Sequence, residues 1–348
     1  MNHFLSLSIP LVMLFTASCA GGSEKQKELG TGQVIPAVLC ASDRSVSYAV
    51  YIPAGCQEGE RLPVYIAFDP HADGSLPVSR YRPLAEQHRF ILMGSNDSRN
   101  GQPADQLQRI AGALVSEAQT RFHADSTRLF FMGFSGGARV SCLLGMYGFP
   151  VKGVIGCGAG LPSTGTPPAG SFDYFVIAGE AVPNLAEVIS QDDALTEAGW
   201  RHRLMVIPGG HAWPPSAEMG KAIQWMKGTL QDMPPHALPY AEFYQIDKES
   251  AIQEDLVRHF EDGDTSWMRK KIGGLASMSE HPASRTDSLI ARRLIAFLGL
   301  LSWSYSTGQM NAGQLDEAYR SLVIYRMVEP ENPAVDSLFD VYYRKRSR

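Results

Sequence analysis

The sequence predicts an α/β protein with a doubly wound, mainly parallel sheet, followed by a small all-helical module. Between positions 45 and 230, short apolar runs typical of buried strands alternate with segments whose apolar residues recur at helical spacing. This alternation is typical of parallel sheets with helices on both faces. After the Pro-rich segment 233–239 only helical spacing remains. With 348 residues, the chain exceeds one typical domain.

The elements follow from the local pattern. The predicted strands are short and largely apolar, and cover 45–52, 62–68, 90–94, 129–132, 153–157, 174–178 and 203–207. Segment 45–52 alternates polar and apolar residues, which is typical of an outer strand. The predicted helices have apolar residues three and four positions apart, and cover 78–88, 105–122, 138–144, 184–198 and 217–230, then 251–260, 289–305, 314–327 and 334–343.

The N-terminus predicts export. Its apolar segment 4–15 is too short for a membrane span, and small residues lead from it to Cys19. This arrangement resembles a bacterial lipoprotein signal, which implies a signal peptide over 1–18, a lipid on Cys19 and a place in the cell envelope, facing the periplasm or the cell surface. A plain secretory signal with an incidental cysteine is the alternative. Segment 19–36 is polar and glycine-rich at its centre, as a flexible tether would be.

Charge and cysteine content limit the partners. The net charge of −5 gives no reason to expect nucleic acid. Without Cys19, an even number of cysteines remains in an oxidising compartment: Cys40, Cys56, Cys142 and Cys157. Cys40 and Cys56 could form a disulfide, whereas Cys142 and Cys157 could pair or remain buried thiols. No metal-ligand spacing occurs, so neither a metal nor a cofactor is predicted.

One turn carries the strongest chemical signal. Gly133-Phe134-Ser135-Gly136-Gly137 stands directly between a predicted buried strand and a predicted core helix. A Gly-x-Ser-x-Gly sequence in this context predicts a nucleophile elbow, in which a strained turn presents the serine hydroxyl above the sheet edge. The alternative is a glycine-rich turn with an ordinary serine.

The order of these parts resembles the α/β-hydrolase family, especially its dienelactone-hydrolase-like and esterase-like branches, over positions 45–230. The resemblance implies a Ser–acid–His order for a catalytic triad. Ser135 would be the nucleophile and His211 the base, since His211 follows a predicted strand in the Gly-Gly-His-Ala-Trp loop. A surface histidine is the alternative. Trp213 would either form a wall of the acyl pocket or pack in the core.

The oxyanion hole of such an enzyme needs two aligned N–H donors. Gly136, directly after the nucleophile, is expected to supply one. Family members often carry His-Gly after the strand at 62–68, but this chain has Asp69-Pro70. Because Pro70 has no N–H, His71 is the expected second donor.

The acid is the member of the triad that departs from the family pattern. Val182 stands where the family carries Asp. Glu180 is the favoured replacement, because its longer side chain could reach His211. The alternatives are a carboxylate from the following helix, Asp192 or Asp193, or Asp69 on a neighbouring loop. A histidine without a carboxylate partner loses its fixed tautomer and the stabilisation of its imidazolium.

The helical module has a resemblance of its own. Segment 313–319 with 329–333 resembles the second helix and closing turn of a tetratricopeptide repeat. Only one such unit is recognisable, whereas stacked repeats usually need about three. The expected organisation is therefore a hydrolase domain over 37–231, a linker over 232–240 and a helical module over 241–348 that could bind a protein partner.

These observations lead to two functional hypotheses. The first is an exported serine hydrolase that cleaves small carboxylic esters through an acyl-serine intermediate; a cell-envelope location suggests carbohydrate-linked esters. The second is a catalytically silent, hydrolase-like lipoprotein that binds a ligand or a partner. The replacement of the usual Asp by Val182 is the feature that separates them.

Overall fold

The computed structural model describes residues 29–57, 59–124, 127–162, 171–230 and 240–347. The predicted signal peptide 1–18, Cys19 and most of the predicted linker 232–240 lie outside the described residues. The chain divides into Met1–Gly30 and Thr31–Arg348, and the fold below is that of the second unit. None of the described helices is long and apolar enough to cross a membrane.

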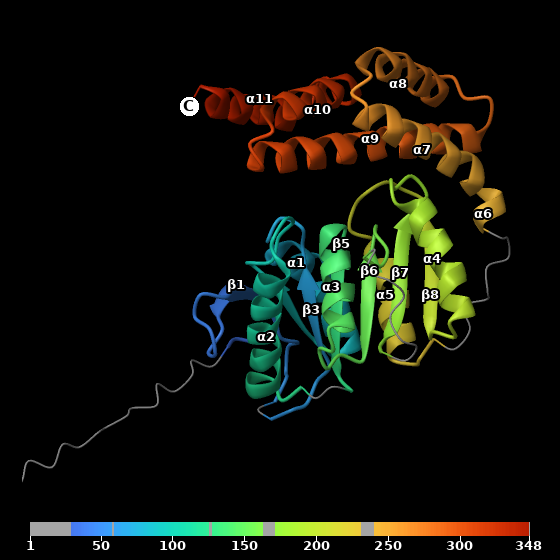
Figure 1. Ribbon diagram of the computed structural model, residues 1–348. Helices are drawn as coiled ribbons and strands as arrows, with labels where there is room; N and C mark the ends of the chain where they lie inside the picture. The colour runs from blue at the N-terminus through green and yellow to red at the C-terminus, as the bar shows by residue number, and fades with distance from the viewer. Residues whose placement is uncertain (1–28, 58, 125–126, 163–170, 231–239, 348) are drawn as a thin grey trace, which may run out of the picture. The chain divides into compact units, whose positions relative to one another are not determined.

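The first part of this unit is built on one eight-stranded sheet with the order β1-β2-β4-β3-β5-β6-β7-β8 (Figure 1). Its strands are β1 Val34–Leu39, β2 Ser47–Tyr51, β3 Val64–Phe68, β4 Ile91–Ser95, β5 Leu129–Phe134, β6 Gly153–Cys157, β7 Asp173–Gly179 and β8 His202–Ile207. Only the pairs β1–β2 and β2–β4 are antiparallel, and the other neighbours are parallel. The predicted mainly parallel sheet is therefore confirmed.

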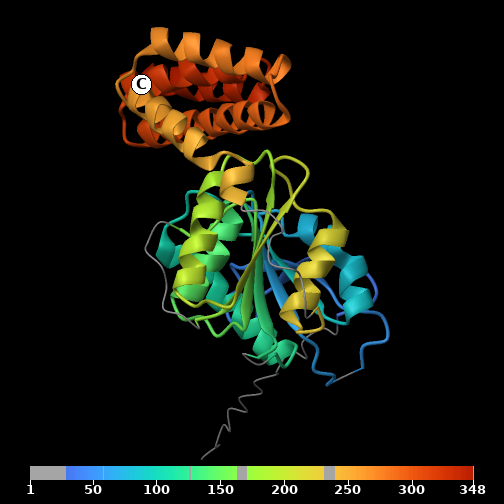
Figure 2. The same ribbon diagram turned by 90° about the vertical axis from the view of Figure 1, so that its right-hand side faces the viewer.

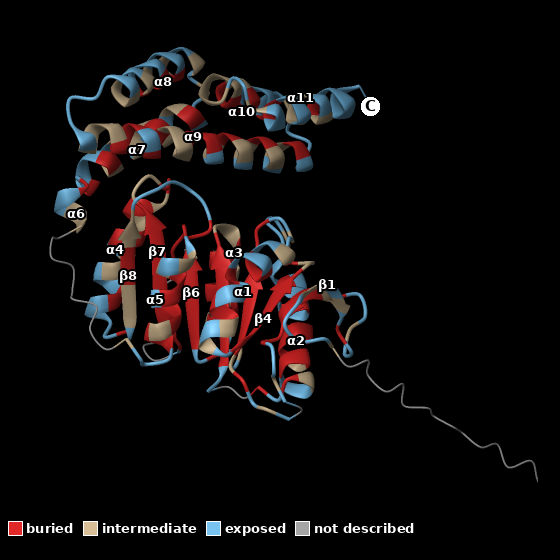
Figure 3. Cartoon of the chain, turned by 180° about the vertical axis from the view of Figure 1, so that it is seen from behind, coloured by how far each residue is buried: buried red, intermediate tan, exposed pale blue. Residues whose placement is uncertain are grey.

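Helices cover both faces of the sheet (Figure 2). They are α1 Ser75–His88, α2 Ala104–Arg121, α3 Gly136–Met146, α4 Leu185–Glu197 and α5 Ser216–Met226. Helices α1 and α5 pack on one face, while α2, α3 and α4 pack on the other. The central strands β3 to β7 are buried along their whole length (Figure 3), which explains their continuous apolar sequences.

The sheet begins earlier than expected. Strand β1 Val34–Leu39 pairs with β2, so the predicted tether 19–36 overlaps the fold and that boundary is corrected. The apolar side chains of Val34, Ile35 and Val38 are partly buried there. Pro36 lies at the irregularity between Ile35 and Val38, a position on an outer strand where its missing N–H is tolerated.

The second part is entirely helical within the described residues. Its helices are α6 Tyr240–Phe243, α7 Ile246–Glu261, α8 Thr265–Glu280, α9 Arg285–Asn311, α10 Leu315–Val328 and α11 Pro333–Arg346. Helices α7 to α10 share one apolar core, in which Leu256, Met268, Leu294 and Ile324 are buried. The predicted helical module is confirmed as a fold.

Helix α8 was not expected. Its buried Met268, Ile272 and Leu275 follow helical spacing, and the Asp264 carboxylate accepts a hydrogen bond from the N–H of Trp267 at its start. Both features are typical helix signals. The paired glycines 273–274 in its middle weaken the helical pattern, because glycine is a poor helix former.

The cysteines Cys40, Cys56, Cys142 and Cys157 are free thiols. The Cys40–Cys56 disulfide, which the sequence left open, is therefore not formed. Burial raises the pKa of the Cys142 thiol to about 12, so this side chain behaves as a small apolar core residue.

Candidate active site

Ser135 stands on a sharp turn between β5 and α3. Its backbone has φ 53° and ψ −119°, a conformation that costs energy for a residue with a β-carbon. The N–H of Ser135 donates to the carbonyl of Cys157 on the neighbouring strand β6, at 2.8 Å. This bond holds the strained residue against the sheet, so that its hydroxyl lies at the carboxyl end of the central strands.

The glycines of this turn are required by close packing. A β-carbon on Gly133 would overlap the carbonyl of Gly137, and one on Gly137 would overlap the carbonyl of Phe68 at the end of β3. The strand, the turn and the first turn of α3 therefore approach each other more closely than any side chain permits. The Gly-x-Ser-x-Gly-Gly sequence is explained by this backbone contact.

His211 meets Ser135 from a loop 76 positions later: Nε2 of His211 lies 2.9 Å from Oγ of Ser135. The loop passes close to the end of β7, where a β-carbon on Gly179 would lie 2.7 Å from the carbonyl oxygen of Gly209. The His211 ring packs against Phe134, with 4.7 Å between the ring centroids. The structure thus brings together the two residues that the sequence singled out as nucleophile and base.

Trp213 anchors the same loop from within the core. It is 4% exposed, packs between Tyr81 and Phe134, and donates its indole N–H to Oδ2 of Asp69 at 2.9 Å. Of its two expected roles, the structure therefore gives Trp213 the core position. Asp69 does not reach His211. Its carboxylate instead binds Trp213, which follows His211 by two residues.

The expectation for His71 is corrected by its hydrogen bonding. The backbone N–H of His71 donates to Oδ1 of Asp69 at 2.9 Å, so it does not point at a substrate. The His71 side chain is 83% exposed. Gly136, by contrast, is the first residue of α3, where the backbone N–H has no partner within the helix. The N–H of Gly136 is therefore not used within the helix, and Gly136 stays the expected first oxyanion donor.

Glu180 does not reach His211 either, which corrects the favoured assignment of the acid. Its carboxylate accepts a hydrogen bond from Arg285, at the start of α9, at 2.5 Å. Its backbone is held as well, because its N–H donates to Ile207 and its carbonyl accepts from Arg293. Val182, at the position where the family carries Asp, is buried.

The remaining carboxylates lie elsewhere. Asp192 contacts His202, with 3.1 Å between Oδ1 and Nε2. In the part of the chain that the structure describes, no carboxylate bonds to Nδ1 of His211. Burial against the protein lowers the pKa of His211, with no opposing effect from a nearby charge. The described site is a serine–histidine pair whose imidazole favours its neutral form.

Sequence reasoning missed Asn100 and Gly158. Gly158 has φ 70°, and a β-carbon there would lie 3.3 Å from Nδ1 of His211, so its position beside the base depends on glycine. A β-carbon on Gly136 would overlap Oδ1 of Asn100 and lie 2.7 Å from its Cγ. The available signal for Asn100 was its place directly after a strand end, at the edge of the sheet where the functional loops gather.

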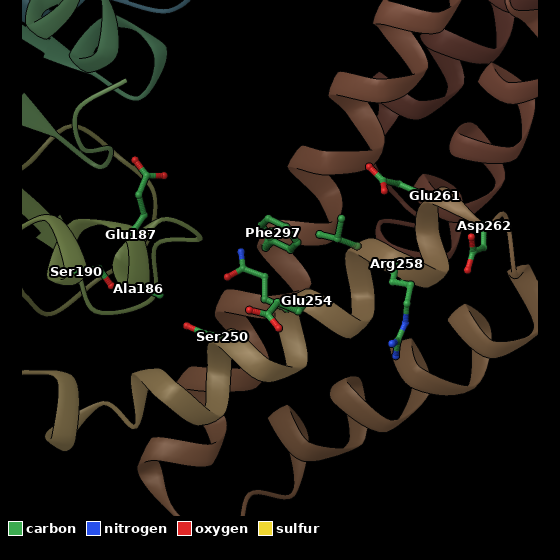
Figure 4. A pocket seen from close by; sticks show the side chains of 11 residues that line it. Ala186, Glu187, Ser190, Ser250, Glu254, Arg258, Glu261, Asp262 and Phe297 are labelled. Atoms are coloured by element: carbon green, nitrogen blue, oxygen red, sulfur yellow. The ribbon is translucent and has the colours of Figure 1, made fainter. Parts of the chain in front are cut away.

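A cleft of about 630 Å³ lies between α4 and the helical module (Figure 4). Its walls come from Glu187 and Ser190 of α4, from several polar side chains of α7, and from Phe297 of α9. Neither Ser135 nor His211 lines it. The helical part therefore contributes to a concave surface that is separate from the serine–histidine pair.

No family model matches the sequence, and no curated protein matches it. Solved structures do. An esterase from Mycobacterium marinum aligns with a TM-score of 0.44 and 18% identity, over 58% of this chain and 82% of its own. An esterase from Pyrobaculum calidifontis aligns with a TM-score of 0.44 and 13% identity, over 58% of this chain and 86% of its own. A dienelactone-hydrolase-like phosphotriesterase from metagenomic libraries aligns with a TM-score of 0.42 and 14% identity, over 53% of this chain and 90% of its own.

These likenesses cover the N-terminal part of the chain. Strand order, parallel pairing and the serine-bearing turn between β5 and α3 define that part as an α/β-hydrolase fold.

Proposed function

We propose that the protein is a serine hydrolase that cleaves small carboxylic esters through an acyl-serine intermediate. The observation that carries the proposal is the 2.9 Å contact between Oγ of Ser135 and Nε2 of His211. A serine hydroxyl is a weak nucleophile unless a base within hydrogen-bonding distance takes its proton. His211 is at that distance and, because burial lowers its pKa, it is neutral and able to accept a proton at neutral pH.

The steps follow from this pair. Oγ of Ser135 bonds to the ester carbonyl carbon while its proton passes to Nε2 of His211, and the carbonyl π electrons move onto the oxygen. The C–O bond to the leaving alcohol then breaks, and His211 returns the proton to that alcohol. Water attacks the acyl-Ser135 by the same route, which releases the acid and restores the serine. The N–H of Gly136 stabilises the negative oxygen in both halves.

The place of action is also part of the proposal. The short apolar segment 4–15 followed by Cys19 supports export and lipid attachment to the bacterial cell envelope. Such a location favours esters linked to carbohydrate as substrates. The cleft beside α4 gives the helical module a surface on which a protein partner could bind.

One observation favours the alternative of a catalytically silent binding lipoprotein. Within the described residues, Nδ1 of His211 has no carboxylate partner, because Glu180 pairs with Arg285. In a serine protease, loss of the carboxylate costs about four orders of magnitude in turnover. A protein with that loss would keep the fold and the pocket while its hydrolysis became very slow.

Labelling with a fluorophosphonate probe separates the two functions. We expect the folded wild-type protein to be labelled, and Ser135→Ala to be unlabelled and to lose its ester hydrolysis, because the nucleophile is removed. The melting temperature of Ser135→Ala should stay near that of wild type, because alanine also has a β-carbon and the strained backbone conformation costs both residues a similar energy. A folded wild-type protein that is neither labelled nor active on p-nitrophenyl acetate would support the silent binding protein.

A further inference from the structure

We propose that the side-chain amide of Asn100 is the second oxyanion donor, opposite the backbone N–H of Gly136. This inference rests on the proposed hydrolase function and names a catalytic residue for it. Asn100 belongs to the loop after β4, whereas the sequence placed this donor in the loop after β3.

The first step is the absence of the expected donors. Pro70 has no N–H, and the N–H of His71 is used by Oδ1 of Asp69. The carbonyl of Pro70 accepts a hydrogen bond from the N–H of Asn100 at 2.9 Å. The loop after β3 was expected to supply the second donor. Instead, its Pro70 carbonyl binds the backbone of Asn100.

The second step is the position of the amide. If Gly136 carried a β-carbon, that atom would overlap Oδ1 of Asn100 and lie 2.7 Å from Cγ and 3.2 Å from Nδ2. The amide thus lies against the residue whose N–H forms the other half of the hole. Turning it about its Cβ–Cγ bond exchanges oxygen and nitrogen, so an N–H of Nδ2 can point to the developing negative oxygen.

This position also explains a glycine that the turn itself does not need. In a Gly-x-Ser-x-Gly turn the residue directly after the serine is variable, and here it is Gly136. Its φ is not positive, so its backbone conformation does not require glycine. Any other residue would displace the Asn100 amide. The glycine at position 136 therefore leaves room for the Asn100 amide in its observed position.

The third step concerns the loop after β4, whose other residues are fixed by hydrogen bonds while the side-chain amide of Asn100 is not. The N–H groups of Asp97 and Ser98 donate to Oγ of Ser95, and Gln102 accepts from the N–H of Arg99 and donates to the carbonyl of Asp97. The Asn100 side chain, in contrast, makes no hydrogen bond within the described part of the chain. The backbone of this loop is therefore fixed, while the exposed side-chain amide of Asn100 remains available to a substrate oxyanion.

The test compares Asn100→Ala and the isosteric Asn100→Asp with wild type on p-nitrophenyl acetate. We expect kcat to fall by about 10²–10³-fold in Asn100→Ala with little change in KM, because the amide binds charge that exists only in the transition state. Asn100→Asp should lose at least as much, since a carboxylate repels the oxyanion. The affinity for a trifluoromethyl ketone should fall in parallel with kcat/KM.

The controls keep this inference separate from the proposed function. Arg99→Ala removes an exposed neighbour on the same loop and should leave kcat unchanged. Asn100→Ala should still be labelled to completion at Ser135 by the fluorophosphonate, only more slowly, and should keep its melting temperature. If wild type hydrolyses the ester and Asn100→Ala keeps its kcat within about twofold, Asn100 is no donor while the hydrolase function stands. If wild type is inactive and unlabelled, both proposals fall.

Discussion

Two neighbouring loops at the carboxyl edge of the sheet differ in how far they follow the α/β-hydrolase pattern. The loop after β8 delivers His211 to Ser135 at 2.9 Å, as α/β-hydrolase order implies. The loop after β7, which carries the acid in that family, is instead tied to α9 through Arg285 and Arg293. The positions of Ser135 and His211 thus agree with the pattern of the hydrolase fold, whereas Glu180 in the loop after β7 contacts the helical module.

The comparison shows a structural reason why Glu180 does not approach His211. Glu180 is not merely distant from His211: its carboxylate and its carbonyl both have cationic partners from α9. Moving this carboxylate to the imidazole would require it to leave Arg285. The helical module therefore holds Glu180 away from His211, although the cleft of the module lies elsewhere.

The largest expected effect comes from breaking the contact that holds the loop after β7. Arg293 is fully buried and bonds to Glu249, at 2.7 Å, as well as to the carbonyl of Glu180. Arg293→Met leaves Glu249 buried without its partner, which should lower the free energy of unfolding by about 3–5 kcal/mol, measured by urea denaturation.

The double variant Arg293→Met/Glu249→Met is the matched control for this prediction. It removes both charges and should regain most of the lost stability, because a buried ion pair is often replaceable by apolar side chains. Equal stability of wild type and Arg293→Met would show that the buried ion pair between α7 and α9 contributes nothing to the free energy of unfolding.

The next effect is the pH dependence of the serine–histidine pair. The active form of His211 is neutral, and burial lowers its pKa, so protonation begins only below the usual range. We expect kcat/KM to be constant at neutral pH and to fall about tenfold per pH unit below a midpoint lower than about 6.5, the ordinary value for histidine. A carboxylate at Nδ1 would favour the charged imidazole and move this midpoint upward. A midpoint above 7 would therefore indicate an acid partner.

The smallest expected effect is that of Glu180→Gln, which tests directly whether the loop after β7 contributes an acid to His211. Glu180→Gln removes the carboxylate that the sequence favoured as a replacement for the missing family Asp. Because this carboxylate pairs with Arg285 and not with His211, kcat should change by less than about threefold. The loss of a triad carboxylate costs about four orders of magnitude instead. A loss of that size, in a variant with unchanged melting temperature, would return Glu180 to the triad.

Sequence patterns predicted the sheet and the helices well, because burial of whole strands leaves continuous apolar runs. They missed β1, whose pairing with β2 leaves it only partly buried, and α8, whose helical spacing is interrupted by paired glycines. In the site, Ser135 and His211 could be found since each lies in a distinctive local sequence. His71 was misassigned because a hydrogen bond to Asp69, only two residues away, had already used its N–H.

By itself, the sequence determined the turn that presents Ser135, because strand, glycines and helix are contiguous and the strain of the turn is resolved within a few residues. Tertiary structure decided everything that depends on partners distant in the chain. Glu180 meets Arg285 across 105 positions, and the Asn100 amide fits only where Gly136 lacks a β-carbon. A hydrogen bond or a steric gap between such residues leaves no local periodicity, so it becomes visible only when the folded chain brings them together.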